Sequence, residues 1–131
     1  MSTRSIPLSN RSSARPIVMV VSAGLAVSAV IHGALIGEHL REAWQFGAFF
    51  IASTAMLAAL AVAVVVAPKR GVLVAALAVS VAMIATWALF RIVPPPFGEG
   101  VEQVDAIGLW CKAAEVVAGV GCVALLRRTR V

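Results

Sequence analysis

The chain has 131 residues, of which 61% are hydrophobic and 13% are charged, and its mean hydropathy is +0.98. A single domain of this size cannot shield so much apolar surface from water, so these values exclude a soluble globular protein. They also exclude a disordered or collagen-like chain, which leaves an integral membrane protein. The net charge of +5 does not indicate nucleic-acid binding, because the basic residues flank apolar runs instead of forming a basic face.

Residues 1–16 are polar, rich in Arg and Ser, and lack apolar periodicity, so we expect a disordered cytoplasmic tail. A secretory signal peptide is the competing interpretation. Its basic residues would be Arg4, Arg11 and Arg15, and its cleavage point would follow the small residues at 26–28. The apolar run is longer than the apolar part of a usual signal peptide, which favours a first helix that is retained.

Four apolar stretches follow, at residues 17–37, 46–67, 72–90 and 106–126. Each is about 20 residues long, the length that crosses the hydrocarbon core of a bilayer as an α-helix. Breaks at 68–71 and 94–98 contain Pro, which cannot continue a helix. We therefore predict an all-α, four-helix transmembrane bundle over residues 17–126, followed by a basic cytoplasmic C-terminus at 127–131.

The Lys and Arg residues beside the spans are unevenly shared between the two faces of the membrane. Only Arg41 and Arg91 lie near one face, together with the acidic residues of the first and third loops. Eight basic residues lie on the opposite face: Arg4, Arg11, Arg15, Lys69, Arg70, Arg127, Arg128 and Arg130. Because positively charged loops stay in the cytoplasm, this pattern predicts that both termini are cytoplasmic.

Three ionisable side chains fall inside the predicted spans: His32 in the first, and Lys112 and Glu115 in the fourth. Charged groups in a bilayer are costly and commonly mark functional sites. Lys112 and Glu115 are three residues apart, so they share a helix face and can pair. One interpretation is a relay in which Glu115 binds a proton or cation, with Lys112 and His32 as its partners. The other is a structural ion pair that holds the fourth helix against the first.

Helical spacing also predicts how the first and fourth spans pack. In each span, residues at alternating spacings of four and three form one stripe of the helix. The stripe of the fourth span contains Gly108, Lys112, Glu115, Gly119 and Cys122, and that of the first contains Ser28, His32, Leu35, His39 and Glu42. Because small residues let backbones approach, we expect the two stripes to face each other and to place His32 level with Lys112.

The end of the first span is a candidate metal site. His39 and Glu42 are three residues apart on one face, and Glu99, Glu102 or Asp105 of the third loop can complete a set of about four ligands. A solvated helix end explains the same residues equally well.

No cofactor is predicted. Both histidines lie on one helix, so a haem with two His ligands would need a homodimer. Cys111 and Cys122 lie about 16 Å apart along one helix, too far for a disulfide, and we interpret them as packing residues. The sequence contains no nucleotide-binding, serine-hydrolase or zinc-protease motif, so we expect no enzymatic activity.

Residues 32–50 combine two histidines with several aromatic residues, and acidic residues recur after the Pro-rich break. The pattern consists of His32, His39, Trp44, Gly47, Phe49, Phe50, Pro96, Phe97, Gly98, Asp105 and Glu115. It resembles a group of uncharacterised small four-span integral membrane proteins of actinobacteria. The resemblance implies four spans and a bacterial plasma membrane, and it implies no activity.

From these observations we expect a multi-pass, non-enzymatic accessory or scaffold protein that acts through helix contacts. Its expected partners are the lipid bilayer and either a second copy of the chain or another membrane protein. One alternative is a small proton- or cation-coupled transporter that uses Glu115, Lys112 and His32. The other is a metal-handling membrane protein with a site at His39 and Glu42.

Overall fold

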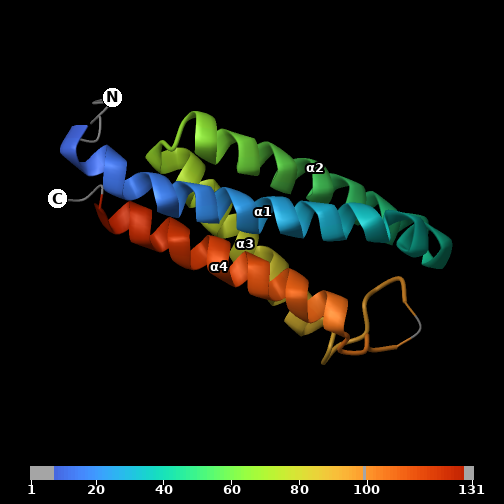
Figure 1. Cartoon of the computed structure of the whole chain (residues 1–131). Helices are drawn as coiled ribbons and strands as arrows, with labels where there is room; N and C mark the ends of the chain where they lie inside the picture. Colours follow the sequence, from blue (N-terminus) through green and yellow to red (C-terminus); the bar gives the residue numbers. More distant parts are fainter. Residues whose placement is uncertain (1–7, 99, 129–131) are drawn as a thin grey trace.

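The computed structural model describes residues 8–98 and 100–128, which form four helices packed side by side (Figure 1). These are α1 (Leu8–Glu42), α2 (Trp44–Val66), α3 (Arg70–Leu89) and α4 (Ala106–Arg128). Each is long and apolar enough to cross a membrane. The prediction of an all-α bundle of four potential membrane spans is confirmed.

The connections lie where the sequence predicts them. α2 ends two residues before Pro68, and α3 begins two residues after it. The longer connection between α3 and α4 is tied to the end of α3, because the Glu102 amide donates to the Phe90 carbonyl over 3.0 Å. Gly100, within this connection, has a positive φ of 124°, a conformation that favours glycine.

The two ends of the bundle differ in what they carry. α1 begins and α4 ends at one end, which we call the termini end (Figure 1). The turn between α1 and α2 and the connection between α3 and α4 lie at the opposite end, which we call the loop end (Figure 1).

α1 extends beyond the predicted first span. Its 35 residues correspond to about 50 Å, against about 30 Å for the hydrocarbon core of a bilayer. Residues 8–16 fall in the tail that we predicted to be disordered, but they are helical. Contacts with the rest of the bundle account for this difference: Ala14 is buried in the core, and Arg128 of α4 donates to the Ser13 carbonyl over 3.0 Å. Residues 1–7 lie outside the described residues.

α4 also runs past its predicted end. Arg127 and Arg128, expected in a basic C-terminal segment, form the last turn of the helix, where cations interact favourably with the helix dipole. Residues 129–131 lie outside the described residues.

α1 and α4 are the central pair of the bundle. α1 packs extensively against α2 and α4, α3 packs mainly against α4, and α2 and α3 make little contact with each other. The half of the bundle nearer the termini end is filled by apolar side chains, including Val21, Leu25, Leu57, Val64, Leu73, Ala118 and Cys122. Most other large apolar side chains face outward, as expected where helices contact lipid.

Small residues bring α1 and α4 together. A Cβ atom at Gly24 of α1 would lie 2.7 Å from the Ala114 carbonyl oxygen and 3.2 Å from the Ala118 Cβ. The backbones of the two helices therefore approach more closely than a side chain at this position allows, as small residues permit in membrane bundles.

We expect Gly24→Ala to lower the free energy of unfolding by about 1–3 kcal/mol, the usual cost of overpacking a tight contact. The measurement is unfolding of the purified protein in mixed micelles, followed by circular dichroism. Gly37→Ala, on the same helix, is the matched control, because a Cβ there meets no atom within 4 Å. Equal losses in the two variants would contradict this account of the contact.

Candidate functional site

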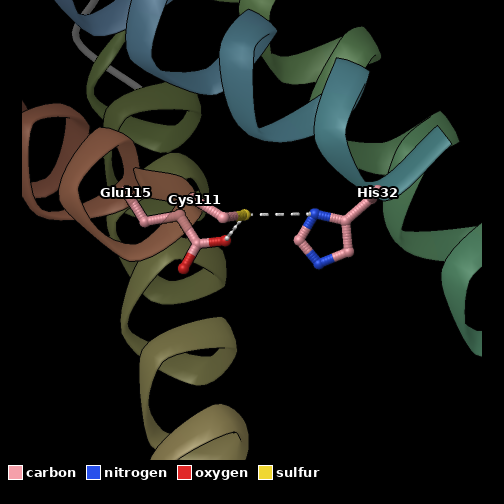
Figure 2. A group of neighbouring side chains, drawn as sticks. All are labelled: His32, Cys111 and Glu115. Carbon is pink, nitrogen blue, oxygen red and sulfur yellow. Dashed lines mark hydrogen bonds between the residues drawn. The ribbon is translucent and has the colours of Figure 1, made fainter. Parts of the chain in front are cut away.

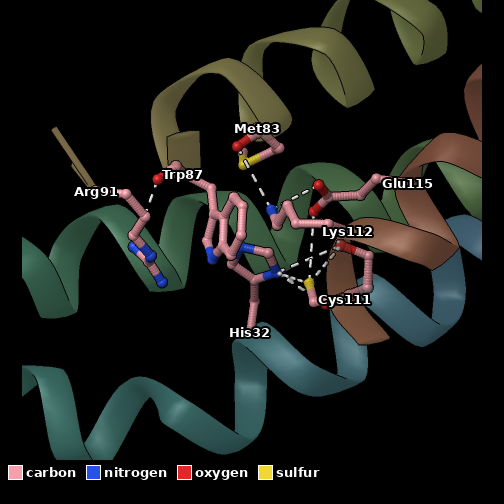
Figure 3. A network of polar contacts seen from close by, with 8 residues as sticks. His32, Met83, Trp87, Arg91, Cys111, Lys112 and Glu115 are labelled. Carbon is pink, nitrogen blue, oxygen red and sulfur yellow. Dashed lines mark hydrogen bonds and ion pairs between the residues drawn. The ribbon is translucent and has the colours of Figure 1, made fainter. Parts of the chain in front are cut away.

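Buried polar side chains gather midway along the helices, on the loop-end side of the apolar core. The group comprises Ser28 and His32 of α1 and Cys111, Lys112 and Glu115 of α4, and we call it the polar cluster (Figure 3). Glu115 is 0% exposed, so its carboxylate depends on the protein for every stabilising contact.

The ion pair predicted within α4 is present. Lys112 Nζ lies 2.6 Å from Glu115 Oε2, as the spacing of three residues allows. The ammonium group also donates to the Met83 carbonyl of α3 over 3.4 Å, so the pair lies between two helices. The Lys112 side chain is 12% exposed, and this pair is therefore almost entirely removed from solvent.

Ser28 links the carboxylate to α1. Its hydroxyl donates to Glu115 Oε1 over 2.8 Å, so the two carboxylate oxygens have different partners: Lys112 on Oε2 and Ser28 on Oε1. The same Ser28 oxygen lies 3.5 Å from Cys111 Sγ and 3.4 Å from His32 Nδ1. Ser28 Oγ therefore contacts His32, Cys111 and Glu115 at the same time.

His32 faces Cys111 across the interface between α1 and α4 (Figure 2). Its Nδ1 lies 2.9 Å from the Ser28 carbonyl oxygen and 3.6 Å from Cys111 Sγ. A carbonyl only accepts hydrogen bonds, so the shorter contact assigns the ring proton to Nδ1. The other side of the ring packs against Phe50 of α2, with centroids 5.2 Å apart.

The predicted pairing of the two stripes is only partly correct. Ser28 and Glu115 do meet, but His32 lies beside Cys111, and Lys112 turns toward α3. Gly119 also faces α3, where a Cβ would lie 3.7 Å from Leu77. The reason is a rotation of α4 about its axis, which turns the predicted stripe toward α3 and places Cys111 against α1.

The structure brings together a set of possible metal ligands that the sequence pattern does not predict. Within residues 8–98 and 100–128, one group of three or more His, Cys, Asp or Glu side chains has its donor atoms within 4.8 Å of one another, namely His32, Cys111 and Glu115. Cys111, which we interpret from sequence as a packing residue, is one of these three. Its spacing of four from Glu115 is the available signal, since that spacing puts both side chains on one face.

His39 and Glu42, the metal ligands predicted from sequence, lie at the loop end. The His39 ring stacks on Phe50 with centroids 3.8 Å apart, and its Nδ1 lies 2.9 Å from the Leu35 carbonyl. Glu42 is exposed at the last position of α1. A metal site there stays a prediction.

The acidic residues of the third loop have structural partners. Glu102 forms an ion pair of 2.7 Å with Arg91, whose guanidinium lies over the Trp87 ring. Asp105 Oδ1 accepts from the Gly108 amide over 2.7 Å, which satisfies one of the free amides at the start of α4. Glu99 lies outside the described residues.

Two hollows lie on either side of the polar cluster. One of about 60 Å³, enough for about two water molecules, lies between α2 and α3, and its lining includes His32, Lys112 and Glu102. The other, an open groove of about 440 Å³ between α3 and α4, is lined mostly by apolar residues but also by Glu115 and by Arg127 at the termini end.

Each hollow has a buried polar atom without a hydrogen-bond partner among the described residues. These atoms are Trp87 Nε1, beside the smaller hollow, and Ser80 Oγ, beside the groove. Buried polar groups of this kind are usually satisfied by water. The smaller hollow therefore suits water or a polar guest next to the cluster, whereas the groove is mostly apolar.

Comparison with protein-family models, with curated proteins and with solved structures gives no match for this chain.

Removing one partner of a buried ion pair costs about 3–5 kcal/mol, because the other charge is left without compensation. We expect this loss of stability for Lys112→Met. Adding Glu115→Gln should restore most of it, since a neutral amide still accepts the Ser28 hydroxyl. A double-mutant cycle of unfolding free energies measures the coupling, and additive losses would show that Lys112 and Glu115 do not interact as described.

Proposed function

We propose that this multi-pass membrane protein is a small cation transporter, in which Glu115 exchanges the Lys112 ammonium for the transported ion. The observation that supports this proposal is a fully buried carboxylate, paired with a movable cation, between two hollows. Ionisable residues inside a membrane bundle commonly mark ion pathways.

A purely structural role does not require charge at this position. Ser28 could hold α4 against α1 through a neutral side chain such as Gln, without the cost of removing two charges from water. The small-residue contact at Gly24 already brings the two helices together. The ion pair therefore has a desolvation cost, although the packing of α1 and α4 does not require the pair. This favours a role in cation binding.

Lys112 is suited to be the competing cation. Its ammonium group ends a flexible four-carbon chain, so it can leave Oε2 for the Met83 carbonyl, already 3.4 Å away, when another cation reaches the carboxylate. The smaller hollow is lined by Lys112, His32 and, from the third loop, Glu102, and we propose that the ion enters there from the loop end. The groove, whose lining is mostly apolar, extends from Glu115 toward Arg127 at the termini end, and we propose that the ion leaves along it.

The accessory role that composition alone favours requires only apolar helix surfaces. The accessory role assigns no function to the ion pair, to His32 or to the two hollows. We propose no enzymatic activity, and we keep the accessory role as the interpretation that follows if transport is not observed.

We propose that the termini end faces the cytoplasm, because it carries Arg127 and Arg128 of α4 and the Lys69–Arg70 turn. Fusions at the C-terminus in a bacterial host measure this orientation. We expect green fluorescence from a fluorescent protein and no activity from alkaline phosphatase, which is active only outside the cytoplasm. The reverse result would overturn the proposed orientation.

Reconstituted protein should carry a cation across liposomes, and Glu115→Gln should abolish this flux, because the amide has no charge to exchange between Lys112 and the ion. The measurement uses indicators for protons, Na⁺ and Zn²⁺ enclosed in the vesicles, with an imposed membrane potential.

Glu42→Gln is the matched control, since it makes the same chemical change at an exposed position. It should transport like the wild type. Flux of all three ions at the level of protein-free vesicles would overturn the proposal, as would wild-type flux through Glu115→Gln.

A further inference from the structure

We infer that the cation bound at Glu115 is a thiophilic transition-metal ion of the Zn²⁺ or Cu⁺ class, and that His32, Cys111 and Glu115 are its ligands. The inference rests on the proposed function in that it names the transported ion. It also moves the metal site from the loop end, where the sequence predicts His39 and Glu42, to the middle of the bundle.

Two of the three distances between donor atoms fit a single ion, and all three donor atoms lie within 4.8 Å of one another (Figure 2). Cys111 Sγ lies 3.6 Å from His32 Nδ1 and 3.5 Å from Glu115 Oε1. In a tetrahedral zinc site, bonds of about 2.3 Å to sulfur and 2.0–2.1 Å to nitrogen or oxygen place such donors about 3.5–3.6 Å apart. A metal ion can therefore be bound with little movement of Cys111 relative to either neighbour.

Ser28 lies beside all three donor atoms without being one of the ligands. Ser28 Oγ lies 3.4 Å from His32 Nδ1 and 3.5 Å from Cys111 Sγ. Its hydrogen bond of 2.8 Å to Glu115 Oε1 fixes the carboxylate toward Cys111. Ser28 thus orients a ligand, as the outer partners of metal ligands commonly do.

The chemistry of the donors selects the ion. One thiol, one imidazole and one carboxylate suit Zn²⁺, and the thiol with the imidazole suits Cu⁺. Mg²⁺ and Ca²⁺ require shells made almost entirely of oxygen, which a thiol and an imidazole do not provide. The pairing of Cys111 with His32 therefore distinguishes this site from a general carboxylate cation site.

Binding displaces protons in a defined way. The Cys111 thiol forms the metal–sulfur bond and loses one proton to solvent, with no change of oxidation state. The His32 ring loses its proton at Nδ1 and carries one at Nε2 instead. Nδ1 then binds the metal and no longer donates to the Ser28 carbonyl.

The metal ion can bind while the ion pair between Lys112 and Glu115 is still intact. The ion approaches Oε1, while Lys112 remains 2.6 Å from Oε2. With Cu⁺, the thiolate, carboxylate and ammonium make the whole group neutral. With Zn²⁺, one positive charge remains, which favours release of Lys112 toward α3 and so links metal binding to the exchange proposed above.

The test is titration of the reduced, metal-free protein in detergent with Co²⁺, a spectroscopic substitute for Zn²⁺. We expect about one ion per chain and a thiolate-to-cobalt charge-transfer absorption. His32→Ala and Cys111→Ser should abolish this absorption. Ser28→Ala should weaken binding about 10–100-fold, the usual effect of removing a group that orients a ligand.

Two matched controls should bind like the wild type. Cys122→Ser removes the other buried cysteine of α4, and the double variant His39→Ala/Glu42→Gln removes the predicted loop-end ligands. A second measurement needs no variant at the site: bound Zn²⁺ should protect Cys111 more than Cys122 from alkylation, as read by mass spectrometry. Competition with Zn²⁺ and with Cu⁺ then shows which ion binds more tightly.

The inference is overturned if the wild type shows no charge-transfer absorption, or if the absorption survives Cys111→Ser. Failure of the site and failure of transport are distinguishable. Metal binding without flux would retain the site and reject the proposed function. Flux of protons or Na⁺ without metal binding would retain the function and reject the metal.

Discussion

The structure depends on a carboxylate placed where water does not reach it. Glu115 is fully buried in the middle of α4, and a charge in such a place needs a partner for each oxygen. Lys112 satisfies one oxygen from the same helix, and Ser28 satisfies the other from α1. Ser28 reaches the carboxylate because the backbones of α1 and α4 lie close together. The hydrogen bond between Ser28 and the carboxylate therefore depends on the glycine contact between these helices.

Much of this arrangement follows from sequence periodicity and length. Apolar runs of about 20 residues predict the four helices, and a spacing of three predicts the ion pair, because both properties belong to a single helix. The rotation of one helix against another does not follow from periodicity or length. Cys111 and Lys112 are neighbours in sequence and point about 100° apart, so a modest rotation of α4 decides which of them meets His32. That rotation depends on packing across two interfaces.

At the loop end, the sequence pattern does not predict the local contacts of the acidic residues. Glu102 and Asp105 resemble candidate ligands because acidic side chains are common in metal sites. In the structure, each has a local role, since Glu102 pairs with Arg91 and Asp105 caps α4. Such roles depend on where a helix starts and how a connection returns, which sequence spacing predicts poorly. Residues 8–16 are a similar case, since their local composition favours disorder while contacts with α4 stabilise a helix.

Because α2 and α3 make little contact, they are the neighbouring helices that separate at the lowest cost. Three of its four sides are held by extensive packing, and the fourth is closed by few contacts. Separation along that fourth side leaves the α1–α4 pair, and with it Ser28 and Glu115, undisturbed. It also exposes His32 and Lys112 sideways, toward the acyl chains of the bilayer. The α1–α4 pair can thus stay in place while the polar cluster becomes accessible from the lipid between α2 and α3.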